Sequence, residues 1–160
     1  MGPKENLFVT KRNGRGKESL NIDKIHSMVE FATDGITGVS ASQVEMNSGI
    51  QFFDGISTED IQQILIKSAN DLISLENPNY QYVAARLLLF SLRKSLFHRL
   101  WEHPTLLQHI KTCVKKGIYD ESILDKYDES EIDRMNMWID HERDYNFTYA
   151  GLRQVIDKYL

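Results

Sequence analysis

The segment from Tyr80 to Leu100 restricts the fold more than any other feature, because it is the most hydrophobic stretch of the chain. When the segment is drawn as a helix, apolar side chains occur on nearly all sides of it, which is typical of a helix buried among others. Four formally charged side chains interrupt it, at Arg86, Arg93, Lys94 and Arg99. We therefore expect a mainly helical domain in which this segment is the central buried helix.

Two helices expected upstream carry clear start signals. Asn21 is a candidate N-cap for an amphipathic segment that Gly35 stops. Ser57 begins another helix, with Asp60 in its first turn, where the helix dipole favours an acid. An apolar stripe continues this helix to Ser74. With the central helix, these two account for three members of an expected four-helix cluster.

A weaker helical pattern lies between those two. Ser40 and Gln43, three residues apart, form a capping-box pattern. A thin apolar face then continues as far as Phe52, with Gly49 inside it. We expect this fourth helix to end at Asp54-Gly55.

The N-terminal region has the pattern of a β-hairpin. Leu7-Phe8-Val9-Thr10 is rich in residues that favour strands. Asn13-Gly14 and Gly16 tolerate the positive φ that a tight turn requires. Lys17 to Asn21 can return as the second strand, so a small antiparallel hairpin is predicted.

The hairpin and the helix start that follows it are basic. Residues 7–25 carry five basic side chains against two acidic ones, in a chain whose net charge is −4. A basic hairpin that leads into a helix N-terminus is typical of an element that binds phosphate, because backbone N–H groups and the helix dipole favour anions there. The other interpretation is a solvated hairpin with charged edges. Both interpretations remain open on composition alone.

Residues 1–100 are expected to form one mainly α domain, four helices capped by the small hairpin sheet. Pro104 marks a boundary, and residues 101–160 are expected to form a further helical segment. One helix predicted there ends at Lys116-Gly117. Three further helices are predicted over residues 120–126, 129–140 and 148–160. The last of them reaches Leu160 without a capping residue, so we expect a truncated protein or the product of a split gene.

Composition excludes several classes of protein. The single cysteine, Cys113, excludes an internal disulfide framework and fits a reducing compartment. No apolar run reaches the length that spans a membrane, and the N-terminus lacks the apolar core of a signal peptide. The mildly acidic balance argues against a broad nucleic-acid surface. We therefore expect a cytoplasmic protein that binds neither nucleic acid nor membranes.

No motif in the chain predicts catalysis or a metal site. Gly14 to Glu18 is not a P-loop, because one residue separates its glycines and Glu18 stands where Ser or Thr is needed. The third glycine and the βαβ unit of a dinucleotide site are also missing. His109 and Cys113 lie one helical turn apart, but a structural zinc site needs four ligands and the other histidines show no paired spacing. We assign Cys113 to packing and the carboxylates near Asp128 to a solvated helix face.

Several segments, taken together, resemble a known family. They are Val9 to Arg12, Leu20 to Ile25, Asp54 to Ile61, Tyr80 to Leu87, Gly117 to Asp120, His141 to Asp144, Phe147 to Gly151, and Lys158 to Leu160. The first four resemble the ATP-cone. The whole set, in this order and spacing, resembles the N-terminal part of the large (alpha) subunit of class Ia ribonucleotide reductase. Each motif is weak alone, and their combination carries the resemblance.

The resemblance implies the regulatory end of an enzyme. The family's large subunit reduces ribonucleoside diphosphates with a cysteine radical inside an α/β barrel, which would lie beyond residue 160, so this stretch would carry no catalytic residues. The cone binds ATP, which activates the holoenzyme, or dATP, which inhibits many members. Mg²⁺ would accompany the nucleotide, and no metal would be held by protein side chains. The implied partners are the rest of the large subunit, the small radical-generating (beta) subunit and further copies in a homo-oligomer.

The resemblance also assigns roles to residues. Lys11, Arg12 and Lys24 would meet the phosphates, and Thr58 and Lys94 would complete the phosphate site. Glu18 and Asn21 would meet the adenine. The expected nucleotide-binding set is Val9, Lys11, Arg12, Glu18, Ser19, Leu20, Asn21, Ile22, Asp23, Lys24, Ile25, Thr58, Ile61, Gln62, Phe90 and Lys94. For Lys94, a lysine that extends along the helix surface to water is the alternative.

Some positions depart from the family pattern. Many dATP-inhibited bacterial members have histidine where this chain has Gln62 and Ser91. The turn Asn13–Lys17 is also longer than in close members. These departures argue against inhibition by dATP and not against nucleotide binding, since some phage-encoded relatives share the glutamine and are not inhibited.

Two other functions are compatible with part of the sequence. A transcriptional repressor of reductase genes also contains an ATP-cone, but it carries a zinc ribbon of four cysteines that this chain lacks. The alternative that remains is a structural helical module whose hairpin docks on a partner subunit without binding nucleotide.

Overall fold

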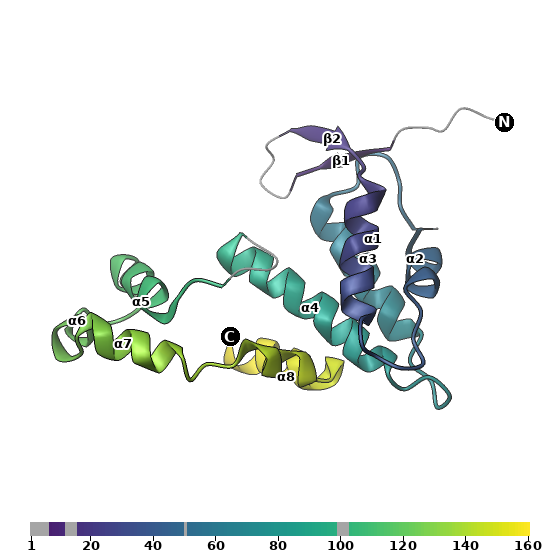
Figure 1. The fold of residues 1–160 in the computed structure, drawn as a ribbon. Helices are drawn as coiled ribbons and strands as arrows, with labels where there is room; N and C mark the ends of the chain where they lie inside the picture. The colour runs from purple at the N-terminus through teal and green to yellow at the C-terminus, as the bar shows by residue number, and fades with distance from the viewer. Residues whose placement is uncertain (1–6, 12–15, 50, 99–102) are drawn as a thin grey trace. The chain divides into compact units, whose positions relative to one another are not determined.

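The computed structural model describes residues 7–11, 16–49, 51–98 and 103–160 (Figure 1). Within these residues the chain forms eight α-helices, one 3-10 helix and a two-stranded antiparallel sheet. The predicted fold class, mainly helical with a small hairpin sheet, is confirmed. The elements are β1 (Phe8–Thr10), β2 (Lys17–Ser19), α1 (Ile22–Thr33), α2 (Ala41–Gly49), α3 (Thr58–Asp71), α4 (Tyr80–Phe97), α5 (Leu106–Lys115), α6 (Ser122–Lys126), α7 (Glu129–Asn136), η1 (His141–Asn146) and α8 (Tyr149–Tyr159).

The chain divides into two compact units. The first unit is Met1–Ser91 with Tyr145–Leu160, and the second unit is Leu92–Asp144. The last helix, α8, therefore belongs to the first unit, together with the hairpin and α1 to α3. The domain boundary expected near Pro104 stays a prediction.

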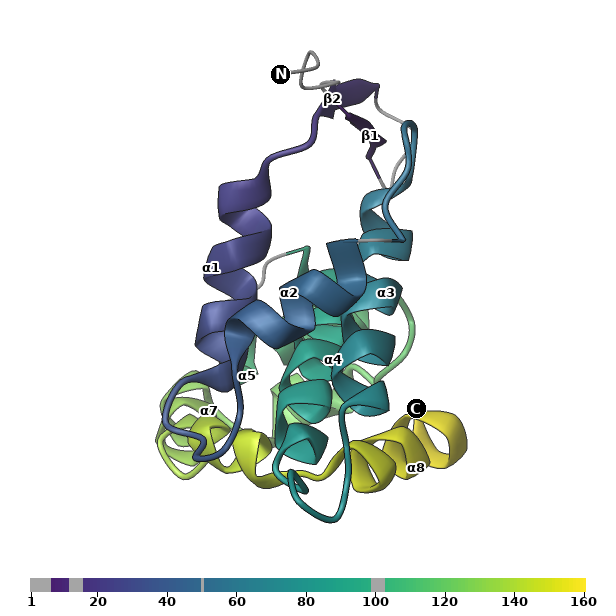
Figure 2. The same ribbon diagram turned by 90° about the vertical axis from the view of Figure 1, so that its right-hand side faces the viewer.

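The helix α4 supplies more of the buried hydrophobic residues of the first unit than any other element. Every residue from Val83 to Phe90 is buried except Arg86, which is half-buried. Figure 2 shows α1 and α3 beside this helix. The expectation that this segment is the central buried helix is confirmed.

Local capping explains where α1 and α3 begin. The Asn21 side chain accepts a hydrogen bond from the Lys24 amide at 3.0 Å. Ser57 Oγ accepts one from the Asp60 amide at 2.9 Å. Both predicted N-caps are confirmed, and each such bond stabilises its helix by about 1 kcal/mol.

The start of α2 uses a buried tyrosine. Ser40 Oγ accepts from the Gln43 amide at 3.4 Å, which is half of the expected capping box. In place of a direct bond from the Ser40 amide to the Gln43 side chain, the Tyr80 hydroxyl bridges the two groups. The Ser40 amide donates to the Tyr80 hydroxyl at 3.0 Å, and that hydroxyl donates to Gln43 Oε1. Tyr80 is 1% exposed, so this relay also satisfies a buried hydroxyl group.

Three helices are shorter than the periodicity predicted. The helix α2 ends at Gly49 instead of reaching Asp54-Gly55, and the Phe52 amide then donates to the Gly49 carbonyl in a turn. Glycine weakens a helix by about 1 kcal/mol relative to alanine, and the thin apolar face offered little to offset this. The helices α3 and α7 end at Asp71 and Asn136, where hydrogen bonds of the tighter i−3 type close the last turns. Residue 50, which was expected inside α2, lies outside the described residues.

The second unit has a small core of its own. The Leu106 amide at the start of α5 donates to Asn136 Oδ1 at the end of α7, at 2.8 Å. Ile110, Cys113 and Ile132 are buried, with exposed fractions between 2% and 9%. The assignment of Cys113 to packing is confirmed.

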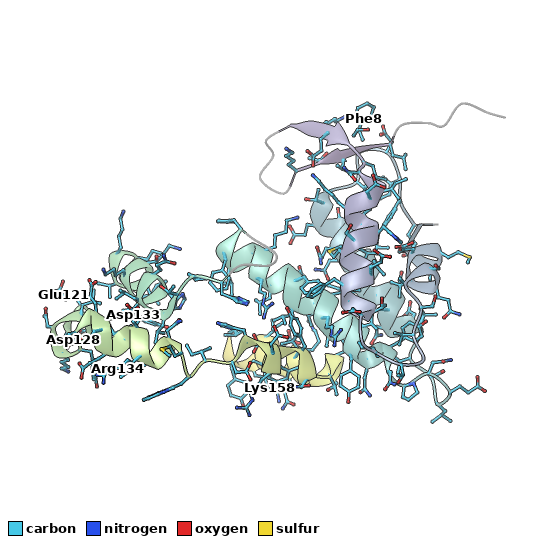
Figure 3. All side chains as sticks on the ribbon, viewed as in Figure 1. Phe8, Glu121, Asp128, Asp133, Arg134 and Lys158 are labelled. Carbon is cyan, nitrogen blue, oxygen red and sulfur yellow. The ribbon has the colours of Figure 1, made fainter. Side chains whose placement is uncertain are left out.

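Acidic side chains lie along α6 and α7, among them Glu121, Asp128 and Asp133 (Figure 3). All three are exposed, as expected for a solvated helix face. Asp128 caps α7 in a full capping box with Glu131. Hydrogen bonds from the Ser130 side chain and from the Glu131 amide lower the pKa of Asp128 below its usual value.

A buried arginine of the second unit pairs with a half-buried carboxylate. The Arg93 guanidinium, 3% exposed, donates to Asp144 at 2.9 Å. The rings of His103 and His141 stack nearby with centroids 3.9 Å apart. Burial, followed by the charge of Arg93, lowers the pKa of His103. The arginine that interrupts the apolar stretch at position 93 is thus neutralised by a partner, as a buried charge must be.

Candidate functional site

Strand β1 joins the hairpin to the start of α3. The Gly55 amide donates to the Phe8 carbonyl at 2.8 Å, and the Thr10 amide donates to the Ile56 carbonyl at 2.9 Å. A parallel β-bridge pairs Thr10 with Ser57, the N-cap of α3. These bonds fix the N-terminus of α3 beside the end of β1.

The other strand of the hairpin leads directly into α1. The Leu20 amide donates to the Leu7 carbonyl at 2.7 Å, which closes the hairpin just before the Asn21 cap. Both views show the hairpin at the N-terminal ends of α1 and α3 (Figures 1 and 2). Two helix N-termini therefore face the same end of the first unit, where their dipoles favour a bound anion.

One face of the hairpin points toward the helices. Val9 is 3% exposed and pairs directly with Glu18 across the strands. Lys11, two residues after Val9, lies on the same side, and its Nζ is 2.9 Å from Glu18 Oε2. The two side chains are 50% and 41% exposed, so this ion pair is worth at most about 1 kcal/mol.

The other expected polar residues lie at the same end. Lys24 and Asp23 are exposed on the first turn of α1, and Ser19 is exposed on β2. Thr58 is half-buried as the first residue of α3. Arg12, expected at the phosphates, lies outside the described residues.

The apolar residues expected in the site divide into two groups. Ile25 and Ile61 are buried beneath the hairpin end of α1 and α3, at 9% and 5% exposed. Leu20 is half-buried and Ile22 is 69% exposed. Phe90 has no exposed surface, and its ring centroid lies 5.5 Å from that of Phe31. Phe90 therefore has a clear structural role in the core.

Gln62 is also part of the core. It is 3% exposed, and its Nε2 donates to the Leu87 carbonyl at 3.2 Å and to Met28 Sδ at 3.4 Å. The side chain thereby connects α3 to α4 and α1. Ser91, the other position that departs from the inhibited family members, is 8% exposed on α4.

Lys94 lies on the last turn of α4, in the second unit. It is half-buried and follows Phe90 by four residues, so both side chains lie on one face of the helix. Its contact with phosphate stays a prediction.

One charged cluster near this site was missed by the sequence reasoning. His26 Nδ1 lies 2.7 Å from Glu45 Oε1, and His26 Nε2 lies 3.1 Å from Glu30 Oε1. The hydrogen bond to Glu45 and the charges of Glu45 and Glu30 raise the pKa of His26. The i,i+4 spacing of His26 and Glu30 was visible in the sequence, whereas the link to Glu45 on α2 depends on the fold.

His26→Gln is expected to lower the melting temperature more at about pH 6 than at about pH 9. Because the folded-state pKa is raised, the contribution of the imidazolium is complete below the ordinary value of 6.5 and disappears as pH rises through the higher folded-state value. Thermal unfolding of both proteins, followed by circular dichroism across this range, measures the difference. A difference that stays constant or grows with pH would contradict the proposed link between α1 and α2.

Two classes of site are not found among the described residues. No group of three His, Cys, Asp or Glu side chains is placed so that it can hold a metal ion. No helix in the same part of the chain has the length and apolar character that crossing a membrane requires.

Comparison with protein families bears directly on the hairpin and the four helices. A family model described as the ATP cone domain matches residues 7–95, from β1 almost to the end of α4. The chain belongs to the ATP-cone family. The matched part includes the hairpin and the N-termini of α1 and α3 that meet at it.

Individual relatives extend the similarity beyond the ATP-cone. The chain is 48% identical over 98% of its length to ribonucleoside-diphosphate reductase 1 subunit alpha of Escherichia coli (strain K12). It is 42% identical over 89% of its length to the reductase subunit alpha of Enterobacteria phage T4. It spans only about a fifth of these proteins, 20% and 19% of their lengths. The resemblance to the large subunit is confirmed: the chain is homologous to the N-terminal fifth of class I reductase alpha subunits.

Proposed function

We propose that this ATP-cone binds ATP or dATP and is the allosteric domain that regulates a ribonucleoside-diphosphate reductase large subunit. The observation that carries the proposal is the attachment of β1 to the start of α3. The bonds from Thr10 to Ile56 and Ser57 bring the α3 N-terminus to the basic hairpin, within the part that matches the ATP cone model. The nucleotide would act as an effector of the reductase, which makes deoxyribonucleotides for DNA synthesis.

Charge and hydrogen-bonding capacity support a triphosphate at this end. Lys11 and Lys24 supply cations, the Thr58 hydroxyl supplies a donor, and two helix N-termini supply backbone N–H groups. Hydrogen bonds between cations and phosphate are roughly twice as strong as neutral ones. By the family resemblance, Arg12 and Lys94 would add two more cations, and Mg²⁺ would accompany the nucleotide.

The same arrangement offers groups for the adenine. Glu18 is an acceptor for the exocyclic amino group, and it lies on the inner face of the hairpin beside Val9. The Asn21 side chain is held at the start of α1 by its bond to the Lys24 amide. Ile22, exposed on the first turn of α1, would cover part of the base.

The partners proposed for this domain follow from the family resemblance. The rest of the large subunit, the small (beta) subunit and other copies of the large subunit would receive the signal of the bound nucleotide. The domain itself would hold no catalytic group.

Isothermal titration calorimetry with ATP and dATP, with GTP as the control nucleotide, tests the proposal. We expect saturable binding of at least one adenine nucleotide and weaker or absent binding of GTP. No heat and no thermal shift with either adenine nucleotide would contradict it. If the small subunit binds the chain in that case, the structural interaction module becomes the better description.

A further inference from the structure

Tyr145 occupies a contact between three segments of the first unit. Its ring centroid lies 6.0 Å from that of Phe31 on α1, in an edge-on arrangement. The guanidinium of Arg86 on α4 lies 5.5 Å from the centre of the Tyr145 ring. Phe31 in turn contacts the buried Phe90. Tyr145 therefore connects the C-terminal part of the chain to both α1 and α4.

Arg86 also holds the end of α1. Its Nη1 donates to the Asp34 carbonyl at 2.6 Å and to the Ala32 carbonyl at 3.4 Å. No basic residue occurs in the last turn of α1 itself, so Arg86 supplies the positive charge that a helix C-terminus favours. One guanidinium thus binds both the end of α1 and the Tyr145 ring.

The segment that follows Tyr145 is the helix α8. It begins four residues later, capped by Thr148, and its Leu152 is 4% exposed in the first unit. In the relatives, the sequence continues past the corresponding position for about four fifths of the protein. The helix α8 thus precedes the part of the relatives that the ATP-cone would regulate.

We propose that Tyr145 is a positioning residue that holds α8 on the ATP-cone, and that nucleotide binding at the start of α1 strengthens this hold. This inference rests on the proposed function. The helix α1 begins with the Asn21 cap at the nucleotide end and carries Phe31 in its last turns, at the Tyr145 contact. A nucleotide that orders the first turn of α1 also restricts its far end, because both belong to one continuous helix of twelve residues.

Hydrogen–deuterium exchange of the whole chain, with and without saturating ATP, tests the proposal. In the parent protein, ATP is expected to slow exchange in the amides of α8 severalfold. Tyr145→Ala is expected to remove this slowing while ATP affinity, measured by calorimetry, is retained. Tyr145→Phe keeps the ring contacts and is expected to behave like the parent. Tyr159→Ala is the matched control, because Tyr159 lies in α8 itself and is 76% exposed. This variant is expected to leave the slowing intact.

The outcomes separate this inference from the proposed function. The inference is overturned if ATP binds the parent protein but leaves exchange in α8 unchanged. It is also overturned if ATP slows exchange in α8 of Tyr145→Ala as much as in the parent. If ATP does not bind, the proposed function fails, but the positioning role is still decided without nucleotide. In that case Tyr145→Ala should speed exchange in α8, and unchanged exchange overturns the role. Tyr145→Leu, which keeps apolar volume without the ring, replaces the alanine variant if that variant does not fold.

Discussion

Replacing Lys11 by alanine is expected to weaken ATP binding by about 1.5–3 kcal/mol, which is roughly a 10- to 150-fold increase in Kd. Lys11 lies at the end of β1 on the face that points toward the helices, where its side chain is 50% exposed and can reach a phosphate. In the structure its Nζ contacts Glu18, and an exposed ion pair of this kind is worth at most about 1 kcal/mol. A charged hydrogen bond to phosphate is stronger, so the lysine is expected to exchange its partner when nucleotide binds.

Calorimetry of the parent and variant measures this effect. Lys67→Ala is the matched control, because Lys67 is an exposed lysine near the opposite end of α3. The control is expected to bind ATP like the parent. By the family resemblance, Lys94→Ala is expected to weaken binding to a similar extent as Lys11→Ala. Unchanged affinity in both of these variants would show that the phosphate assignment is wrong.

Replacing Phe90 by alanine is expected to lower the free energy of unfolding of the first unit by about 3–5 kcal/mol. Phe90 has no exposed surface, and its ring packs against Phe31. The substitution removes both the transfer free energy of a buried aromatic ring and the contacts of the groups around the cavity. Since stability is only about 5–15 kcal/mol for an ordinary domain, the loss is a large fraction of the total.

Urea unfolding followed by far-ultraviolet circular dichroism measures this loss. The described tryptophan, Trp138, lies in the second unit, so its fluorescence does not report on the first unit. Phe90→Leu is the control, and it is expected to cost clearly less because most of the apolar volume remains. A loss below about 1 kcal/mol in Phe90→Ala would show that the core around α4 does not depend on this ring.

The features that the sequence predicted correctly are local ones. The caps Asn21 and Ser57 lie within three residues of the amides they bind, so a short window contains both partners. The apolar character of α4 is likewise visible in a single segment. The strands β1 and β2 are close in sequence, and Gly16 has the positive φ of 101° that its predicted place in the turn requires.

The features that could not be predicted depend on contacts between distant segments. The bridge from Thr10 to Ser57 places the α3 start at the hairpin, and no local pattern encodes it. The contact of Tyr145 with Arg86 and Phe31 has the same origin. The α2 helix was predicted too long because Phe52 looked like a continuation of its apolar face, whereas the chain turns at Gly49. Periodicity indicates which side chains are buried but not what they pack against.

The family resemblance supplied the expected site residues, and the structure shows that three of them lie at one end of the first unit. Lys11, Lys24 and Thr58 come from three separate elements that meet through the hairpin. Gln62 and Phe90 have roles in the core that the resemblance did not indicate. Substitution of either residue would therefore lower the stability of the domain, in addition to any effect that it has on nucleotide binding.

The most direct test of the central claim is a nuclear magnetic resonance titration of the isotopically labelled chain with ATP. We expect the largest amide shifts at Lys11, Lys24 and Thr58, where the hairpin meets the N-termini of α1 and α3. Shifts that are absent, or that are confined to the lysines of α5 in the second unit, would contradict a nucleotide site at the hairpin.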